Sequence, residues 1–215
     1  MTQIRAIIFD SDGTLLNSLI LFAGAYQHVA QQFGYRPPTT EEVRAQLNGK
    51  PLADIYQNLF PGCDVDAMIT ANGAYIEAHY TDSAAFDGLQ TMLEALQKQG
   101  LKLGIVTGSD HRVHDLYEHH GLADYFGAIV HNGDVRHTKP HPEGFLLAAQ
   151  RLGVAPAECC MVGDAPFDIL IGKNGGAGMT VGITHGYNSR NDLLAADPDY
   201  IVDDLPALQQ LLLRL

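Results

Sequence analysis

The chain has 215 residues, of which 46% are apolar, and a formal net charge of −12 at pH 7. This length allows one good hydrophobic core, or one core plus a small second domain. The acidic balance argues against binding to a nucleic-acid backbone, which needs a basic stripe, and no apolar run is long enough to cross a membrane. The chain starts with a strand-like stretch instead of a signal peptide, so we expect a cytoplasmic location.

Short β-branched runs alternate with helical stretches along most of the chain, which predicts a parallel sheet with crossover helices. The expected strands are Ile4 to Phe9, Lys102 to Val106, Ala128 to His131, Cys159 to Gly163, Met179 to Ile183 and Tyr200 to Val202. Apolar residues at helical spacing, as at Leu89, Met92, Leu93 and Leu96, predict helices between them. We therefore predict the α/β class, with a three-layer core around a mainly parallel sheet.

Residues 17–87 interrupt this alternation, because they show helical patterns and turns but no convincing strand. After a first apolar stripe, further helices are expected to begin near Glu41, Pro51 and Asp64. A stretch of this length is too long for an ordinary connection between strands. We predict two domains, an α/β core of residues 1–16 and 88–215 and a helical module of residues 17–87.

Two carboxylates, Asp10 and Asp12, directly follow the first expected strand and precede a glycine. Carboxylates at the end of a buried strand must be hydrated, paired or bound to a metal ion. The alternative interpretation is a plain turn, in which Asp12 and Gly13 are turn residues and Asp10 caps a helix.

Thr107 and Gly108 follow the second strand in the same way. A hydroxyl and free backbone amides at such a position could hold a phosphate oxygen. A plain helix cap by Ser109 or Asp110 is the alternative.

Lys139 lies in a loop, because Pro140 prevents the next helix from starting earlier. An isolated lysine in a loop is usually a surface residue. Two more carboxylates, Asp164 and Asp168, follow the fourth strand, and a cap role for Asp164 is the simpler alternative.

Taken together, these motifs resemble the four ordered motifs of the haloacid dehalogenase superfamily. They are the DxDGT sequence at Asp10, the threonine at Thr107, the lysine at Lys139 and the GDxxxD sequence with Asp164 and Asp168. Residues 17–87 resemble the type I cap of that superfamily. The chain is most similar to its phosphoglycolate-phosphatase-like branch, although Ser11, Asn17 and Gly108 depart from the residues usual there.

The resemblance implies a Rossmann-like strand order, a catalytic core and a cap. It also implies a Mg²⁺-dependent phosphatase that acts on a small phosphorylated metabolite such as phosphoglycolate, as a monomer or a homodimer. Asp10 would be the nucleophile and form an aspartyl-phosphate, and Asp12 would be the general acid and base. Thr107, Gly108 and Lys139 would bind the transferring phosphoryl group.

The same resemblance implies a metal site. Asp10, the carbonyl group of Asp12 and Asp164 would be the ligands, and Asp168 would support them without a metal bond of its own. Electrostatics agrees, because Asp10, Asp164 and a phosphate would repel one another strongly without a cation and Lys139.

Lys50 lies within the expected cap, and a lysine there is the reason to consider a second class of enzyme. A phosphonoacetaldehyde-hydrolase-like enzyme would use it to form a Schiff base with an aldehyde, whereas in a phosphatase it would bind an anion. Such hydrolases lack an aspartate at the position of Asp12. A sugar-phosphate mutase resembling β-phosphoglucomutase would share the core and differ mainly in its cap.

The ten histidines raise the question of a zinc site. His111 with His114, and His119 with His120, lack a third ligand at suitable spacing, so we expect no zinc site. His137 and His141 flank Lys139 and could face the phosphate site.

Overall fold

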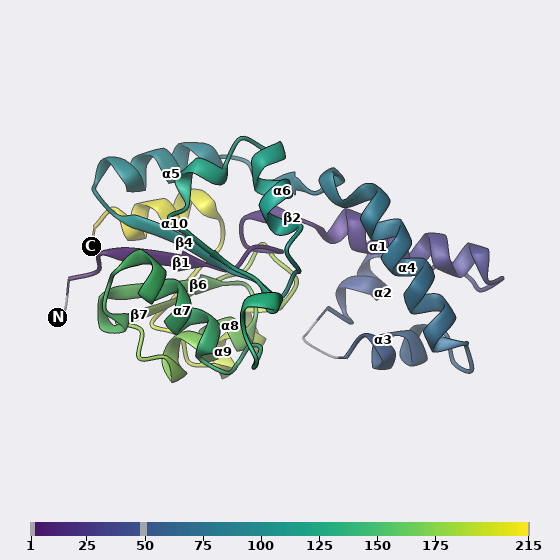
Figure 1. Cartoon of the computed structure of the whole chain (residues 1–215). Coiled ribbons are helices and arrows are strands. Elements are labelled where there is room, and N and C mark those ends of the chain that lie inside the picture. Colours follow the sequence, from purple (N-terminus) through teal and green to yellow (C-terminus); the bar gives the residue numbers. More distant parts are fainter. Residues whose placement is uncertain (1–2, 48–50, 215) are drawn as a thin grey trace. The chain divides into compact units, whose positions relative to one another are not determined.

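The computed structural model describes residues 3–47 and 51–214, and the chain divides into two compact units. One comprises Met1–Leu16 and Ala85–Leu215, and the other comprises Asn17–Ala84 (Figure 1). Where the chain passes between them, β2 (Leu16–Asn17) and β3 (Ala84–Ala85) pair in a two-stranded sheet. The expectation of no strand within residues 17–87 is therefore wrong at both ends, since two-residue strands show no periodic pattern.

The second boundary lies three residues before the predicted one, because residues 85–87 belong with the α/β unit. The backbone N–H of Phe86 donates to the carbonyl oxygen of Leu15 at 3.1 Å. The ring of Phe86 stacks on His185, with ring centroids 3.9 Å apart. That one unit is a catalytic core and the other a cap stays a prediction.

The α/β unit is built on a six-stranded sheet with the order β5-β4-β1-β6-β7-β8, in which the neighbouring strands are parallel. The strands are β1 (Ala6–Phe9), β4 (Lys102–Val106), β5 (Ala128–Val130), β6 (Cys159–Gly163), β7 (Met179–Ile183) and β8 (Tyr200–Val202). After β1 the chain adds β4 and then β5 next to one edge of β1, and it then returns to place β6, β7 and β8 beyond the other edge of β1. This is the Rossmann-like order, and it confirms the predicted class; its switch point lies between β1 and β6.

Helices cover both faces of this sheet (Figure 1). They are α5 (Leu89–Lys98), α6 (Val113–His119), α7 (Glu143–Leu152), α8 (Pro166–Asn174), α9 (Arg190–Ala195) and α10 (Leu205–Leu212). In Figure 1, α5 and α10 lie on one face while α7 and α8 lie on the other, which gives three layers. Short 3₁₀ turns occur at Ala123–Tyr125, Asn132–Asp134 and Pro156–Glu158. The predicted stripe of α5 is fully buried, as its periodicity requires.

The second unit consists of α1 (Leu19–Gln32), α2 (Thr40–Arg44), α3 (Leu52–Leu59) and α4 (Val65–His79), followed by a 3₁₀ turn at Tyr80–Asp82. The helices expected from Glu41, Pro51 and Asp64 begin within one residue of those positions. Aromatic and aliphatic side chains of this unit form a separate core, which includes Tyr26, Tyr56, Phe60 and Met68. Within residues 3–47 and 51–214, each helix is too short or too polar to span a membrane.

Candidate active site

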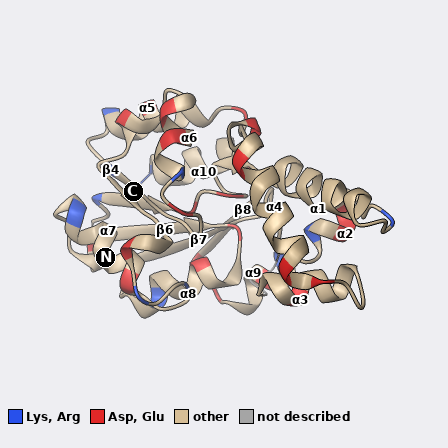
Figure 2. Ribbon diagram, turned by 45° about the vertical axis from the view of Figure 1, so that its right-hand side comes forward, with Lys and Arg blue, Asp and Glu red and all other residues tan. Residues whose placement is uncertain are grey.

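The polar residues identified from the sequence lie at the carboxyl edge of the sheet. Asp10 directly follows β1, Thr107 follows β4 and Asp164 follows β6. Because β1 pairs in register with β4 on one side and with β6 on the other, the three loops are neighbours. Figure 2 shows acidic residues, in red, in the loops that follow the strands. The topology therefore brings together side chains that are far apart in the sequence.

Lys139 reaches this edge from the loop between β5 and α7. Its Nζ lies 2.6 Å from Oδ1 of Asp10 and 2.7 Å from Oδ1 of Asp168, and no side chain of the three is more than 9% exposed. Burial lowers the pKa of Lys139, but the charges of Asp10 and Asp168 more than offset this effect, so the pKa lies above its ordinary value. Lys139 is thus a buried, charged ammonium group, and its interpretation as a surface residue is wrong.

Asp164 is held by neutral donors. The backbone N–H of Tyr187 donates to its Oδ2 at 2.7 Å, and the hydroxyl of Thr14 donates to its Oδ1 at 3.2 Å. Burial and the nearby charges of Asp10 and Asp168 raise the pKa of Asp164 well above its usual range. The site therefore contains more negative charge than these groups neutralise.

Two glycines let the backbone approach Asp164 closely. A Cβ at Gly13 would lie 2.6 Å from Oδ2 of Asp164, and a Cβ at Gly186 would overlap the same carboxylate. Gly13 also has a φ of +87°, a left-handed conformation that favours glycine. Any side chain at these two positions would displace Asp164.

The carboxylates of Asp10, Asp164 and Asp168 suit a divalent cation. Each offers an oxygen atom, and these atoms lie within 4.8 Å of one another. Burial and the charge of Asp10 raise the pKa of Asp168 to about 7, although Lys139 opposes this shift. Two buried carboxylates with raised pKa values indicate unbalanced negative charge, which a hard cation with oxygen ligands would neutralise. The plain turn is therefore an insufficient account of Asp10.

Asp12 is held by a residue that the sequence suggested only as a helix cap. The hydroxyl of Ser109 donates to Oδ2 of Asp12 at 2.7 Å, and the backbone N–H of Ser109 donates to Oγ1 of Thr107 at 3.0 Å. Asp12 is half-buried. Sequence reasoning missed this contact because it joins two loops that are 97 positions apart.

The remaining predicted binding residues differ in what they contact. Thr107 is buried, and its backbone N–H donates to the carbonyl oxygen of Val130 at 2.9 Å. The carbonyl oxygen of Gly108 accepts from the side chain of Asn132, and a Cβ at Gly108 would meet no atom within 4 Å. This leaves space for a ligand beside the Gly108 backbone. Lys50 lies outside the described residues.

His137 and His141 do not contact the buried carboxylates in the way their positions beside Lys139 suggested. Both side chains are more than half exposed. Their rings pack against each other, with centroids 4.5 Å apart, and Nδ1 of His137 lies 3.0 Å from Oε2 of Glu143.

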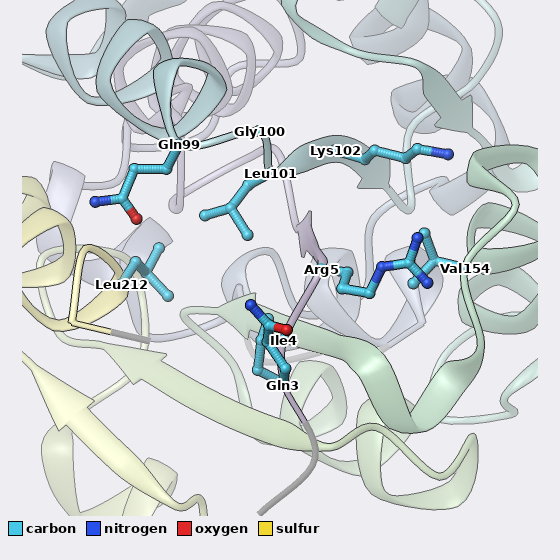
Figure 3. Close-up of a pocket in the computed structure, with 9 residues that line it drawn as sticks. All are labelled: Gln3, Ile4, Arg5, Gln99, Gly100, Leu101, Lys102, Val154 and Leu212. Carbon is cyan, nitrogen blue, oxygen red and sulfur yellow. The ribbon is translucent and has the colours of Figure 1, made fainter.

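A cavity of about 250 Å³ lies at the opposite edge of the sheet, where the strands begin (Figure 3). Its lining includes Arg5, which precedes β1, and Lys102, the first residue of β4. Arg5 pairs with Glu158 at 3.2 Å, and Lys102 donates to the carbonyl oxygen of Leu152 at 2.6 Å. Both cations therefore have partners of their own, and this cavity is separate from the carboxylate site.

Known proteins with similar sequences and structures indicate which family combines a Rossmann-like sheet with this set of carboxylates and lysine. The sequence matches the haloacid dehalogenase-like hydrolase family over residues 7–182, and the chain belongs to that family. Pyrophosphatase PpaX of Oceanobacillus iheyensis is 34% identical over 94% of this chain and 94% of the relative. The phosphoglycolate phosphatase of Vibrio parahaemolyticus is 31% identical over 97% of this chain and 96% of the relative. A solved haloacid dehalogenase-like hydrolase of Streptococcus pneumoniae is 26% identical, with a TM-score of 0.86 over 98% of this chain and 99% of that chain.

Proposed function

We propose that the protein is a Mg²⁺-dependent phosphomonoester hydrolase that acts on a small phosphorylated metabolite through an aspartyl-phosphate on Asp10. The observation that carries the proposal is the buried contact of Lys139 with Asp10 and Asp168, beside Asp164. An anionic substrate binds to an acidic protein where local positive charge outweighs the background field. The ammonium group of Lys139 and a cation on the carboxylates would supply that charge.

Asp10 is the nucleophile in this proposal. An ionised carboxylate needs no general base to activate it. Its Oδ1 contacts Lys139 at 2.6 Å, and its Oδ2 accepts a long bond of 3.5 Å from the hydroxyl of Thr14. These contacts fix the orientation of the carboxylate. Attack on phosphorus forms the bond from Asp10 to phosphorus and breaks the bond from phosphorus to the leaving oxygen.

Asp12 is the general acid and then the general base. It gives a proton to the leaving alkoxide, and afterwards it takes a proton from the water that attacks phosphorus. That second attack breaks the bond to Asp10 and releases inorganic phosphate. The bond from Ser109 orients Asp12, and its half-buried position gives it access to water.

Lys139, Thr107 and Gly108 bind the transferring phosphoryl group. The ammonium group of Lys139 offsets charge on the phosphoryl oxygens, while the Thr107 hydroxyl and the Gly108 amide are hydrogen-bond donors. Asp168 holds Lys139 at 2.7 Å and so supports the site without binding metal itself.

Asp10, the backbone carbonyl of Asp12 and Asp164 are the proposed Mg²⁺ ligands. When bound there, Mg²⁺ would neutralise the carboxylates and the phosphoryl oxygens, which is the main task of such an ion in phosphoryl transfer. The raised pKa of Asp164 supports this assignment. Burial and the nearby carboxylates disfavour the negative charge of Asp164, and a bound cation would compensate for that charge.

Turnover of an aryl phosphate by Asp10→Asn protein tests the proposal. Asparagine has nearly the same shape but is a poor nucleophile, so we expect kcat to fall by at least about 10³-fold. Asp115→Asn, which changes an exposed aspartate on α6, is the matched control and is expected to retain activity. Unchanged turnover by Asp10→Asn protein would remove the proposal.

The names of the relatives favour two candidate substrates, phosphoglycolate and inorganic pyrophosphate. Phosphoglycolate leaves an alkoxide that needs a proton from Asp12, whereas pyrophosphate leaves a phosphate group, which is a weaker base and needs that proton less. Initial rates on both substrates identify the better one. For either outcome, Asp12→Asn is expected to reduce kcat/KM for phosphoglycolate more strongly than kcat/KM for pyrophosphate, because this ratio reports departure of the leaving group and not the later hydrolysis of the aspartyl-phosphate, which both substrates share.

Two other enzyme classes stay predictions. A phosphonoacetaldehyde hydrolase would need Lys50 to form its Schiff base. The Schiff base would assist departure of the leaving group, so the Asp12 carboxylate would have no catalytic role. A sugar-phosphate mutase would return the phosphoryl group to a sugar instead of water. A screen of phosphonoacetaldehyde and hexose phosphates, with and without Mg²⁺, separates these classes from a phosphatase. The monomeric or homodimeric state and the cytoplasmic location are likewise predictions.

A further inference from the structure

His137, His141 and Glu143 lie together around the loop that carries Lys139 into α7. Nδ1 of His137 is 3.0 Å from Oε2 of Glu143, and Nδ1 of His141 is 3.9 Å from the same oxygen. One ligand atom from each residue lies within 4.8 Å of the other two. In a tetrahedral Zn²⁺ site, bonds of about 2.0–2.1 Å place the ligand atoms about 3.3 Å apart. The distances from the two histidines to Oε2 of Glu143 bracket that value.

The carboxylate of Glu143 is already oriented by its own loop. The backbone N–H of Arg136 donates to Oε1 at 3.0 Å, and the backbone N–H of His137 donates to Oε2 at 3.0 Å. Outer hydrogen bonds of this kind hold the ligands of metal sites in place. Two imidazoles and one carboxylate also form a common ligand set for Zn²⁺, with a fourth position open to water.

The cluster is accessible to an ion from solvent. The side chain of His137 is 63% exposed and that of His141 is 51% exposed. Both lie in an open depression of about 640 Å³, which Pro140 and Pro142 also line. The net charge of −12 favours the approach of cations in general.

A bound cation would replace two contacts within the cluster. The backbone N–H of Glu143 donates to Nδ1 of His141, and this contact is long at 3.3 Å. Nδ1 of His137 lies 3.0 Å from Oε2 of Glu143, and an ion between these two atoms would exchange this contact for a bond from each of them. The two exposed rings pack against each other, with centroids 4.5 Å apart.

We propose that His137, His141 and Glu143 form a second cation site, which binds Zn²⁺ or a transition metal of similar ligand preference. The ligands come from both sides of Lys139, whose Nζ contacts Asp10 and Asp168. Occupation of this site therefore clamps the loop that presents the lysine to the buried carboxylates. The proposal concerns binding, and so it stands or falls independently of the reaction at Asp10.

Calorimetric titration with Zn²⁺ in excess Mg²⁺ tests this site, using Asp164→Asn protein so that the carboxylate site does not contribute. We expect one equivalent of Zn²⁺ to bind. Adding His137→Ala and His141→Ala together should weaken the affinity by at least about tenfold, the scale of loss for even indirect changes at metal sites. Adding His119→Ala, which removes an exposed histidine of α6, should leave the affinity unchanged.

Amide hydrogen exchange gives a second readout of the same proteins. Zn²⁺ is expected to slow exchange in residues 136–143 of the Asp164→Asn protein, and to have no such effect once both histidines are replaced. Absence of Zn²⁺ binding by the Asp164→Asn protein would overturn the proposal. Equal Zn²⁺ affinity with and without the two histidines would overturn it as well.

Discussion

Lys139 and Asp168 form a buried ion pair, in which Nζ lies 2.7 Å from Oδ1 and the Asp168 side chain has no exposed surface. The other carboxylate oxygen of Asp168 accepts the backbone N–H of Ala165 at 3.0 Å. Asp168 is thereby fixed at the start of α8. Through this pair, the loop after β5 is anchored to the carboxyl end of β6, while the second contact of Lys139 reaches Asp10.

Lys139→Met is expected to lower the free energy of unfolding by about 3–5 kcal/mol at neutral pH without metal, because it leaves buried carboxylates without their cation. Urea denaturation measures this change. Adding Asp168→Asn to Lys139→Met should restore part of the stability, since it removes one of the uncompensated charges, but it should not restore turnover. If Lys139→Met protein and the double variant have the same free energy of unfolding, the charge of Asp168 does not destabilise the protein without Lys139. That result would contradict an energetic contribution from the buried ion pair.

Asp164→Asn is expected to stabilise the metal-free protein and to abolish its stabilisation by Mg²⁺. Asparagine keeps an oxygen that can accept the backbone N–H of Tyr187, yet it carries no charge to be buried. The folded-state pKa of Asp164 is raised, so the folded protein retains a proton that the unfolded chain loses near pH 4. Wild-type stability should therefore fall, relative to the variant, as pH rises from about 4 toward that raised pKa.

Melting temperatures in a metal chelator between about pH 5 and pH 8 measure this difference, and taking wild type minus variant removes the contribution of titrating groups that lie far from Asp164. In excess Mg²⁺ the order should reverse, with wild type gaining stability and the variant gaining little. If wild-type protein is more stable than Asp164→Asn protein across this pH range without metal, the hydrogen bonds to Asp164 compensate for the burial of its charge and no cation is needed there.

Gly186→Ala is expected to weaken Mg²⁺ binding and turnover together, because its Cβ would overlap the carboxylate of Asp164. The Mg²⁺ concentration at half-maximal activity measures the effect, and we expect it to rise by at least about tenfold. Gly73→Ala is the matched control, since a Cβ there meets nothing within 4 Å on the exposed side of α4. A Gly186→Ala protein with normal Mg²⁺ dependence would argue against Asp164 as a ligand.

Ser109→Ala is expected to lower kcat by about tenfold while changing KM little, because in the proposed mechanism Ser109 positions Asp12 and does not itself react. Ser109→Thr keeps the hydroxyl and should retain most of the activity. Steady-state kinetics on a phosphomonoester, with the pH profile of kcat, separate this role from a loss of folding. If the two variants have the same kcat, the hydroxyl contact to Asp12 at 2.7 Å has no catalytic importance.

Much of the fold, and the positions of the candidate site residues at the strand ends, were predictable because each depended on a local pattern. The apolar runs of β4, β6, β7 and β8 have the predicted bounds, and the polar residues that follow the strands meet at one edge. Parallel pairing makes this convergence unavoidable once the strand order is known. The strand β1 begins two residues later than expected and β5 ends one residue earlier, as is usual for boundaries.

The contacts that sequence reasoning missed depend on tertiary structure. Ser109 with Asp12 and Tyr187 with Asp164 join loops from different strands, and neither pair leaves a spacing signal. The sequence placed His137 and His141 beside Lys139 and suggested that they face the phosphate site, whereas the structure brings both rings to Glu143. Their positions beside Lys139 do not indicate this contact, because it depends on how the loop folds back on the start of α7.

Detection of a covalent phosphate on Asp10 tests the central claim most directly. The protein is mixed with an aryl phosphate and Mg²⁺, quenched in acid during turnover, digested and examined by mass spectrometry. The account predicts one phosphoryl group on the peptide that contains Asp10, and its absence from Asp10→Asn protein. Product release in a pre-steady-state burst, with no phosphoryl group on that peptide at any time, would contradict it.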